Sequence, residues 1–255
     1  VRLLRNIFHT GLFENPYLEV AETEKIVGNP DFMKAGYDAQ LKSIVMLKNK
    51  EKALPLKKEI KVYVPKKTIP AGRDFMGNPT PESVNYPVNM DILKKYFTPT
   101  DNPSEADIAL VFIDSPNSGA GYDREDVKKG GNGYVPISLQ YSPYKAVYAR
   151  EQSIAGGDPL ENFTNRTYKG KTVKSANEGN LKMVLDAKKA MNGKPVIVSI
   201  NVSKPMVFSE FEKDANAILV NFGVQDQAVL DILSGAAEPS ALLPLQMPAD
   251  MKTVE

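Results

Sequence analysis

The sequence has no cysteine, and it has one histidine, His9, among its 255 residues. Without thiols the chain cannot form disulfides, thiolate nucleophiles or zinc–thiolate sites. A single imidazole also excludes multi-histidine metal centres and most Ser-His-Asp arrangements. Acid–base or nucleophilic chemistry would have to come from carboxylates or tyrosines. We expect neither a metal nor a cofactor.

The chain also lacks an excess of charge of one sign and lacks long apolar runs. It has 32 Lys and Arg against 31 Asp and Glu, a net charge of +1. With balanced charge the chain has no excess of positive charge that would attract the phosphates of nucleic acid. No apolar run approaches the roughly 18–20 residues that span a bilayer. We therefore expect no nucleic-acid partner and no membrane insertion.

What is present is an alternation of apolar strand-like runs with helical patterns. This alternation predicts an α/β fold, a three-layer sandwich with a mostly parallel sheet of about six strands and helices on both faces. The strands are expected over residues 43–47, 61–64, 107–113, 195–202 and 217–222, and the helices from 31 and over 89–97, 179–192, 205–211 and 225–233.

The N-terminal segment, residues 1–28, is predicted as a short helix followed by an extended linker. Residue 1 is Val rather than Met, and no start signal or cleavable apolar segment follows it. We therefore expect that the chain is cut from a longer protein. The predicted organisation is a linker over 1–28 and one domain over 29–255.

A long irregular stretch, residues 114–176, follows the apolar strand 107–113 directly. In open α/β sheets ligands bind beyond the carboxyl ends of the strands, so this stretch is the first place to look for a site. It opens with a glycine-rich 118–124 loop. Glycines allow close approach of backbone to a ligand, and the carboxylates of Asp123, Glu125 and Asp126 could bind hydroxyls or move protons. A solvated turn with a charge cluster is the alternative reading of the same residues.

Tyrosines are concentrated in the same irregular stretch. Their rings could stack on sugars or bases, or they could anchor a long loop to the core. The five are Tyr122, Tyr134, Tyr141, Tyr144 and Tyr148.

Five segments occur in a familiar order along the chain. They are Gly-Leu-Phe-Glu-Asn-Pro-Tyr at 11–17, Ser-Ile-Val-Met-Leu-Lys-Asn at 43–49 with Leu-Pro-Leu at 54–56, Ser-Gly-Ala-Gly-Tyr-Asp-Arg at 118–124, the run 217–222 with helix 225–233, and Gly235 with Pro-Ser-Ala-Leu-Leu-Pro at 239–244. Together they resemble the C-terminal α/β sandwich domain of family 3 glycoside hydrolases, the β-glucosidase and β-xylosidase group.

The resemblance implies a retaining β-glycosidase whose nucleophile is an Asp on an N-terminal (β/α)8 barrel, which this chain does not contain. In many members a Glu of the 118–124 loop is the general acid/base, and this sequence has Ala120 there. A methyl group cannot donate a proton, so the acid would have to lie elsewhere: Glu125 and Glu151 are the candidates in this chain, and an acid from the missing barrel is the alternative. The implied substrate-binding residues are Ser118, Gly119, Gly121, Tyr122, Asp123 and Arg124.

The resemblance also implies partners and a compartment. The substrate would be a β-linked oligosaccharide or aryl glycoside, the protein partner the chain's own barrel, and the location the periplasm or the cell exterior. The chain alone is expected to be inactive, and its role would be to complete the sugar-binding cleft. Two alternatives stay open: a non-catalytic carbohydrate-binding or scaffold domain that has lost its acid/base, and a free-standing flavodoxin-like binding domain.

Overall fold

The computed structural model describes the chain except for Val1, Phe75, Ala120 and residues 152–166. It divides into two units, Val1–Gln40 and Leu41–Glu255. The first unit holds helices α1 (Arg2–His9) and α2 (Val20–Ile26) and most of α3 (Pro30–Ser43). In the part of the chain that the structure describes, no helix is long and apolar enough to cross a membrane.

Two local predictions for this segment are wrong. Residues 20–26 form a helix instead of an extended linker, because the Val-Ala-Glu-Thr-Glu-Lys-Ile run is rich in helix formers and carries a Glu22–Lys25 ion pair of 2.6 Å. The second concerns the N-cap of α3: the sequence favours Asp31 in that role, whereas the helix begins at Pro30. Its N-terminal N–H groups are capped by Asn29, whose Oδ1 accepts from the Asp31 N–H at 2.9 Å.

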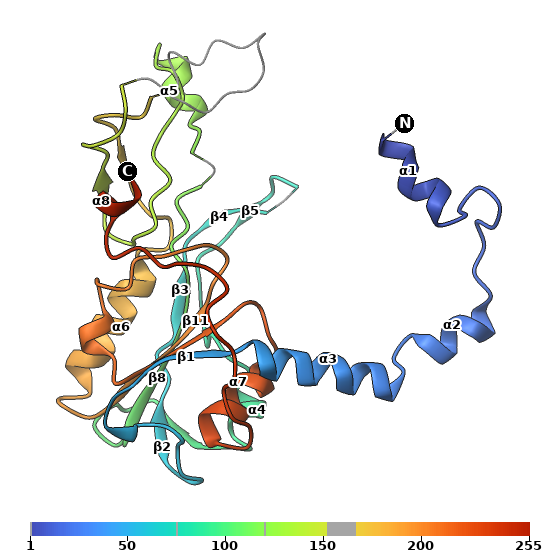
Figure 1. Ribbon diagram of the computed structural model, residues 1–255. Coiled ribbons are helices and arrows are strands. Elements are labelled where there is room, and N and C mark those ends of the chain that lie inside the picture. The colour runs from blue at the N-terminus through green and yellow to red at the C-terminus, as the bar shows by residue number, and fades with distance from the viewer. Residues whose placement is uncertain (1, 75, 120, 152–166) are drawn as a thin grey trace. The chain divides into compact units, whose positions relative to one another are not determined.

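The second unit is built on a six-stranded sheet (Figure 1). Its order is β1-β12-β11-β8-β2-β7, and every neighbouring pair is parallel except β1 with β12. The strands are β1 (Val45–Asn49), β2 (Lys61–Tyr63), β7 (Thr98–Thr100), β8 (Ile108–Asp114), β11 (Val196–Asn201) and β12 (Ala217–Asn221). The predicted mostly parallel α/β sheet is confirmed.

Helices cover both faces of this sheet. On one face α6 (Gly179–Ala190) packs on alternate residues of the central strands, including Val111, Val198 and Ile218, in the main apolar core. The other face carries α7 (Asp226–Ser234), which packs with the short α4 (Met90–Leu93). Because side chains alternate along a strand, Phe112 and Ser199 face the α7 side.

Several shorter elements lie outside the six-stranded sheet. Two antiparallel ribbons lie between β2 and α4, β3 (Lys67–Ile69) with β6 (Ser83–Asn85) and β4 (Gly72–Arg73) with β5 (Pro79–Thr80). The irregular stretch contains α5 (Arg124–Lys128) and the pair β9 (Tyr144–Lys145) with β10 (Thr172–Val173), and α8 (Met251–Val254) lies near the C-terminus.

The short helix expected over residues 205–211 does not form. Met206 and Val207 are buried there in irregular chain, and the Val207 N–H donates to the Leu139 carbonyl at 2.8 Å. That bond joins the segment to the irregular stretch instead of to its own helical turn. Two 3₁₀ turns occur elsewhere, at Lys50–Lys52 and Glu212–Asp214.

Candidate functional site

The carboxyl edge of the parallel sheet is where ligands are expected in this architecture. Numbered along the chain, the five parallel strands lie in the order 2-1-3-4-5, a doubly wound order whose switch point falls between β2 and β8. The 118–124 loop leaves the carboxyl end of β8, as the sequence predicts.

The first half of this loop is anchored from within. Ser118 is 9 % exposed, and its hydroxyl donates to the Ser138 carbonyl at 3.0 Å. Gly121 has φ +76°, and a Cβ added there would lie 3.0 Å from Ile137 Cγ1. Gly119, also at φ +76°, donates its N–H to Asn117 Oδ1 at 3.2 Å. Ser118 therefore fixes the loop, and the glycines are required by backbone conformation.

The second half of the loop begins α5. Asp123 is the N-cap, and its Oδ1 accepts from the Glu125 N–H at 2.8 Å. Its own N–H donates to the Gly133 carbonyl at 2.7 Å. The side chains of Tyr122 and Arg124 are exposed, and Arg124 makes no ion pair within the described part of the chain. Asp123 is exposed as well, but its carboxylate caps α5. Of the predicted binding residues, Tyr122 and Arg124 therefore present side chains that a ligand could reach without breaking this cap.

Asp126, in α5, connects this helix to two segments that lie later in the chain. It accepts from Lys171 Nζ at 2.7 Å and from the Gly133 N–H at 2.8 Å. The hydrogen bond from Lys171, followed by that from Gly133, lowers the pKa of the Asp126 carboxyl below its ordinary value. The predicted proton-shuttling role does not suit a carboxylate held in this way, because both contacts stabilise its charged form.

The two candidate substitute acids are both exposed and paired with lysine. Glu125 lies 2.6 Å from Lys128, and Glu151 lies 3.0 Å from Lys169. The hydrogen bond and charge of Lys169 lower the pKa of Glu151, which is opposite to what a general acid needs. Ala120 itself lies outside the described residues.

The predicted tyrosines differ in how deeply they are buried. Tyr141 is completely buried, packs with Phe211, and donates its hydroxyl to the Asp114 carbonyl at 2.6 Å. It anchors the stretch to the core, and burial raises the pKa of its phenol. Tyr122 is 51 % exposed and meets Tyr134 edge-on, with ring centroids 5.7 Å apart. Tyr148 is exposed too, with Lys252 Nζ 5.1 Å from its ring centroid.

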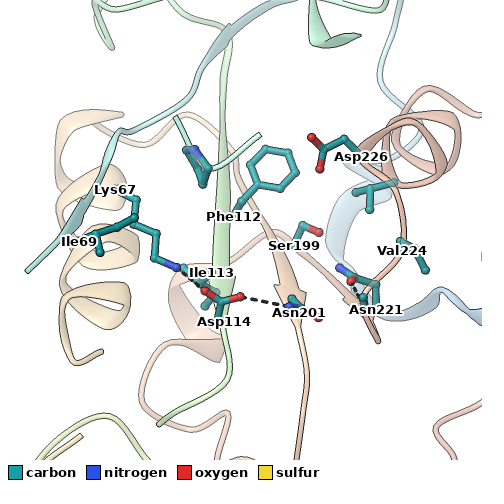
Figure 2. A pocket seen from close by; sticks show the side chains of 13 residues that line it. Lys67, Ile69, Phe112, Ile113, Asp114, Ser199, Asn201, Asn221, Val224 and Asp226 are labelled. Carbon is teal, nitrogen blue, oxygen red and sulfur yellow. Dashed lines mark hydrogen bonds and ion pairs between the residues drawn. The ribbon is translucent and has the colours of Figure 1, made fainter. Parts of the chain in front are cut away.

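A pocket at the same edge was not anticipated from the sequence. It lies on the α7 side of β8, β11 and β12 and has a volume of about 330 Å³ (Figure 2). Its floor is a row of registered strand-terminal residues, Asp114 beside Asn201 and Asn201 beside Asn221. One sequence feature could have indicated this polar floor: each of these three apolar strands ends in Asp or Asn. We refer to this cavity as the carboxyl-edge pocket.

These features define a class: a doubly wound α/β domain whose glycine-rich loop and pocket share one sheet edge. Comparison with known proteins makes the assignment more specific. The sequence profile of the glycosyl hydrolase family 3 C-terminal domain matches residues 155–255. The resemblance read from the motifs is confirmed: the matched profile is that of the family 3 C-terminal domain, and the chain is similar over its length to named β-glucosidases.

Individual relatives agree with this assignment. A probable β-glucosidase C of Aspergillus flavus is 26 % identical over all of this chain and 30 % of its own length. A periplasmic β-glucosidase/β-xylosidase of Dickeya chrysanthemi is 23 % identical over 99 % of this chain and 29 % of its own. The crystal structure of a β-glucosidase from Listeria innocua shares the fold, with a TM-score of 0.55 at 18 % identity, over 95 % of this chain and 30 % of that one. This chain thus spans about a third of the length of these relatives.

Proposed function

We propose that this chain is the C-terminal domain of a retaining β-glycosidase acting on β-glucosides, and that it forms one wall of the sugar-binding cleft. The observation that carries the proposal is the glycine-rich loop at the carboxyl end of β8, with Tyr122 and Arg124 exposed at its outer side. An exposed tyrosine ring can stack on a sugar face, and a guanidinium donates to hydroxyls. The named β-glucosidases among its relatives support the same substrate class.

The reaction class needs two carboxyl groups about 5–5.5 Å apart, one nucleophile and one acid/base. The nucleophile would come from a barrel domain of the complete protein. This chain alone is then inactive, and hydrolysis of an aryl β-glucoside by the isolated chain would contradict the proposal. The periplasm or the cell exterior is the compartment that we propose, in line with the printed name of the Dickeya relative.

The wall-forming role is tested in the complete protein with Tyr122→Ala and Arg124→Ala. Loss of a stacking or charged hydrogen-bonding contact lowers kcat/KM by about tenfold or more. The matched control is Lys189→Ala, an exposed cation in the last turn of α6. Because that helix runs antiparallel to the strands, Lys189 is remote from the carboxyl edge. Equal kcat/KM in all three variants would contradict a cleft role for the loop.

The acid/base is tested with Glu125→Gln and Glu151→Gln. Loss of a general acid slows substrates with poor leaving groups and spares activated aryl glycosides, whose leaving group needs no proton. The acid is identified by the variant that loses activity on substrates with poor leaving groups and keeps activity on activated aryl glycosides. If neither variant behaves in this way, the acid is not one of these two carboxyls.

A second function is favoured by one observation, the alanine at position 120 in place of the family's Glu. In that case the complete protein would bind oligosaccharides without turning them over. Isothermal titration of the complete protein with a β-linked oligosaccharide, together with a turnover assay, distinguishes the two: affinity without hydrolysis favours the binding domain.

A further inference from the structure

The carboxyl-edge pocket is lined by a buried serine hydroxyl, that of Ser199. Ser199 is 4 % exposed, and its Oγ has no hydrogen-bond partner among the described residues. Buried polar atoms nearly always have a partner, because an unmet hydroxyl away from water costs free energy. Ser199 lines the pocket, and Figure 2 shows it between Phe112 and Asn221. A molecule in the pocket would supply the missing partner.

Among the described residues that line the pocket, the one cation, Lys67, is already paired with a carboxylate. The ammonium of Lys67 is paired with the Asp114 carboxylate, whose Oδ1 also accepts from Asn201 Nδ2 at 3.2 Å. Asp226 adds a carboxylate whose Oδ2 accepts from the Asn89 N–H at 2.7 Å, with no cation paired to it in the described part of the chain. An anion such as phosphate would meet this net negative charge. Neutral hydroxyls can both donate to the carboxylates and accept from the amides.

The remaining walls are apolar. Phe112 and Val229 line the pocket together with Ile69 and Pro87. A volume of about 330 Å³ is at the small end of ligand sites, roughly 300–1,000 Å³. Apolar walls around a few polar groups suit a compact molecule that has C–H faces and hydroxyl edges.

We propose that the carboxyl-edge pocket binds a neutral, hydroxylated small molecule of monosaccharide size, through Ser199, Asn221 and Asp226. The site is distinct from the cleft wall proposed above. The 118–124 loop is anchored through Ser138, whereas the pocket lies on the α7 side of the strands. The proposal does not depend on glycosidase activity.

The test uses the complete protein with its isoleucine and valine methyl groups labelled for NMR. Ile69 and Val229 line the pocket, whereas Ile108 lies at the amino end of β8 and serves as the reference. Glucose, myo-inositol and inorganic phosphate are titrated separately into the millimolar range. We expect both neutral probes to shift the Ile69 and Val229 signals, with Ile108 unmoved and phosphate without effect. Absence of these shifts with both neutral probes, or shifts with phosphate alone, would overturn the proposal.

Substitutions locate the binding. Ser199→Ala removes the hydroxyl and should weaken the affinity read from these signals by about fivefold. The matched control, Ser104→Ala, changes an exposed serine before the amino end of β8 and should leave the affinity unchanged. Unaltered affinity in Ser199→Ala would contradict the assignment.

A second variant keeps the test decisive if Ser199→Ala fails to fold. Val224→Phe enlarges a half-buried lining residue and should abolish the shifts by filling the cavity. Retained shifts in Val224→Phe would overturn the proposal. Hydrolysis of aryl glucosides is measured in parallel, and we expect it to be unchanged in Ser199→Ala, so that failure of the pocket proposal and failure of the proposed function give different results.

Discussion

Lys171 and Asp126 are 45 residues apart in the sequence, and the Lys171 ammonium lies 2.7 Å from Asp126 Oδ2. The same ammonium also hydrogen-bonds Asn132 Oδ1, so one lysine connects α5 to the turn that follows it. Both partners are partly buried, with side-chain exposures of 26 % and 31 %. The pair ties the segment after β8 to the strand β10 region and thereby fixes the end of the 118–124 loop.

Removing this ammonium should loosen the loop and leave the sheet intact. In Lys171→Met the aliphatic stem remains, and Asp126 and Asn132 lose a shared donor. We expect several-fold faster amide hydrogen exchange over residues 121–134, with unchanged exchange in β8 and β11. Lys169→Met, which breaks an exposed pair with Glu151, is the control. Equal exchange in both variants would show that the pair does not order the loop.

The pairing should also depend on pH. The hydrogen bond from Lys171 depresses the pKa of Asp126 in the folded state, so the contribution of the pair is complete above the ordinary Asp pKa of about 4. It is lost as the pH falls further, through the depressed folded-state value. Carboxyl ¹³C NMR should therefore show Asp126 titrating below the ordinary value in the parent protein and at a higher pH in Lys171→Met, where the Gly133 N–H remains as a donor. An unshifted Asp126 in the parent would refute this.

Two glycines after α5 offer a matched comparison. Both Gly130 and Gly133 have positive φ, so alanine at either position costs about 1–2 kcal/mol of local strain. Only at Gly133 would the added Cβ also collide, at 2.6 Å from the Tyr122 ring and 2.7 Å from Val127. Gly133→Ala should therefore displace Tyr122, and Gly130→Ala should not. The aromatic ¹H NMR signals of Tyr122 and Tyr134 report the displacement; equal spectra for the two variants would contradict the packing described.

The anchoring tyrosine can be tested through stability. Tyr141→Phe keeps the buried ring and removes the hydroxyl that donates to the Asp114 carbonyl. We expect a loss of about 1 kcal/mol in the free energy of unfolding, as for other single buried hydrogen bonds. Urea denaturation measures it, with Tyr17→Phe, 81 % exposed, as the control. A loss no larger than that of the control would remove Tyr141 as an anchor.

Most of the sheet could be predicted from the sequence because its central strands are continuous apolar runs. The runs at 107–113 and 217–222 correspond to β8 and β12 within one residue at each end. Strand β7 was missed because Thr98-Pro99-Thr100 is short and proline argues against a strand. It is tolerated here because β7 is at the edge of the sheet, where a missing N–H leaves no neighbour unpaired.

The candidate site was only partly predictable. The position of the 118–124 loop at the end of β8 follows from the order of strand and glycines. Which of its side chains turn inward does not, because that depends on contacts such as the bond from Ser118 to the Ser138 carbonyl. The binding role of the predicted residues and the acid role of Glu125 and Glu151 stay predictions.

The sequence by itself determined the class of fold and the family resemblance, since strand periodicity and ordered motifs are local properties of the chain. Only the tertiary structure decided the carboxyl-edge pocket. Asp114, Asn201 and Asn221 are far apart along the chain, and they become neighbours because parallel pairing sets the ends of β8, β11 and β12 in register. The same pairing buries Ser199 beside Phe112, where its hydroxyl loses water without gaining a partner in the described protein.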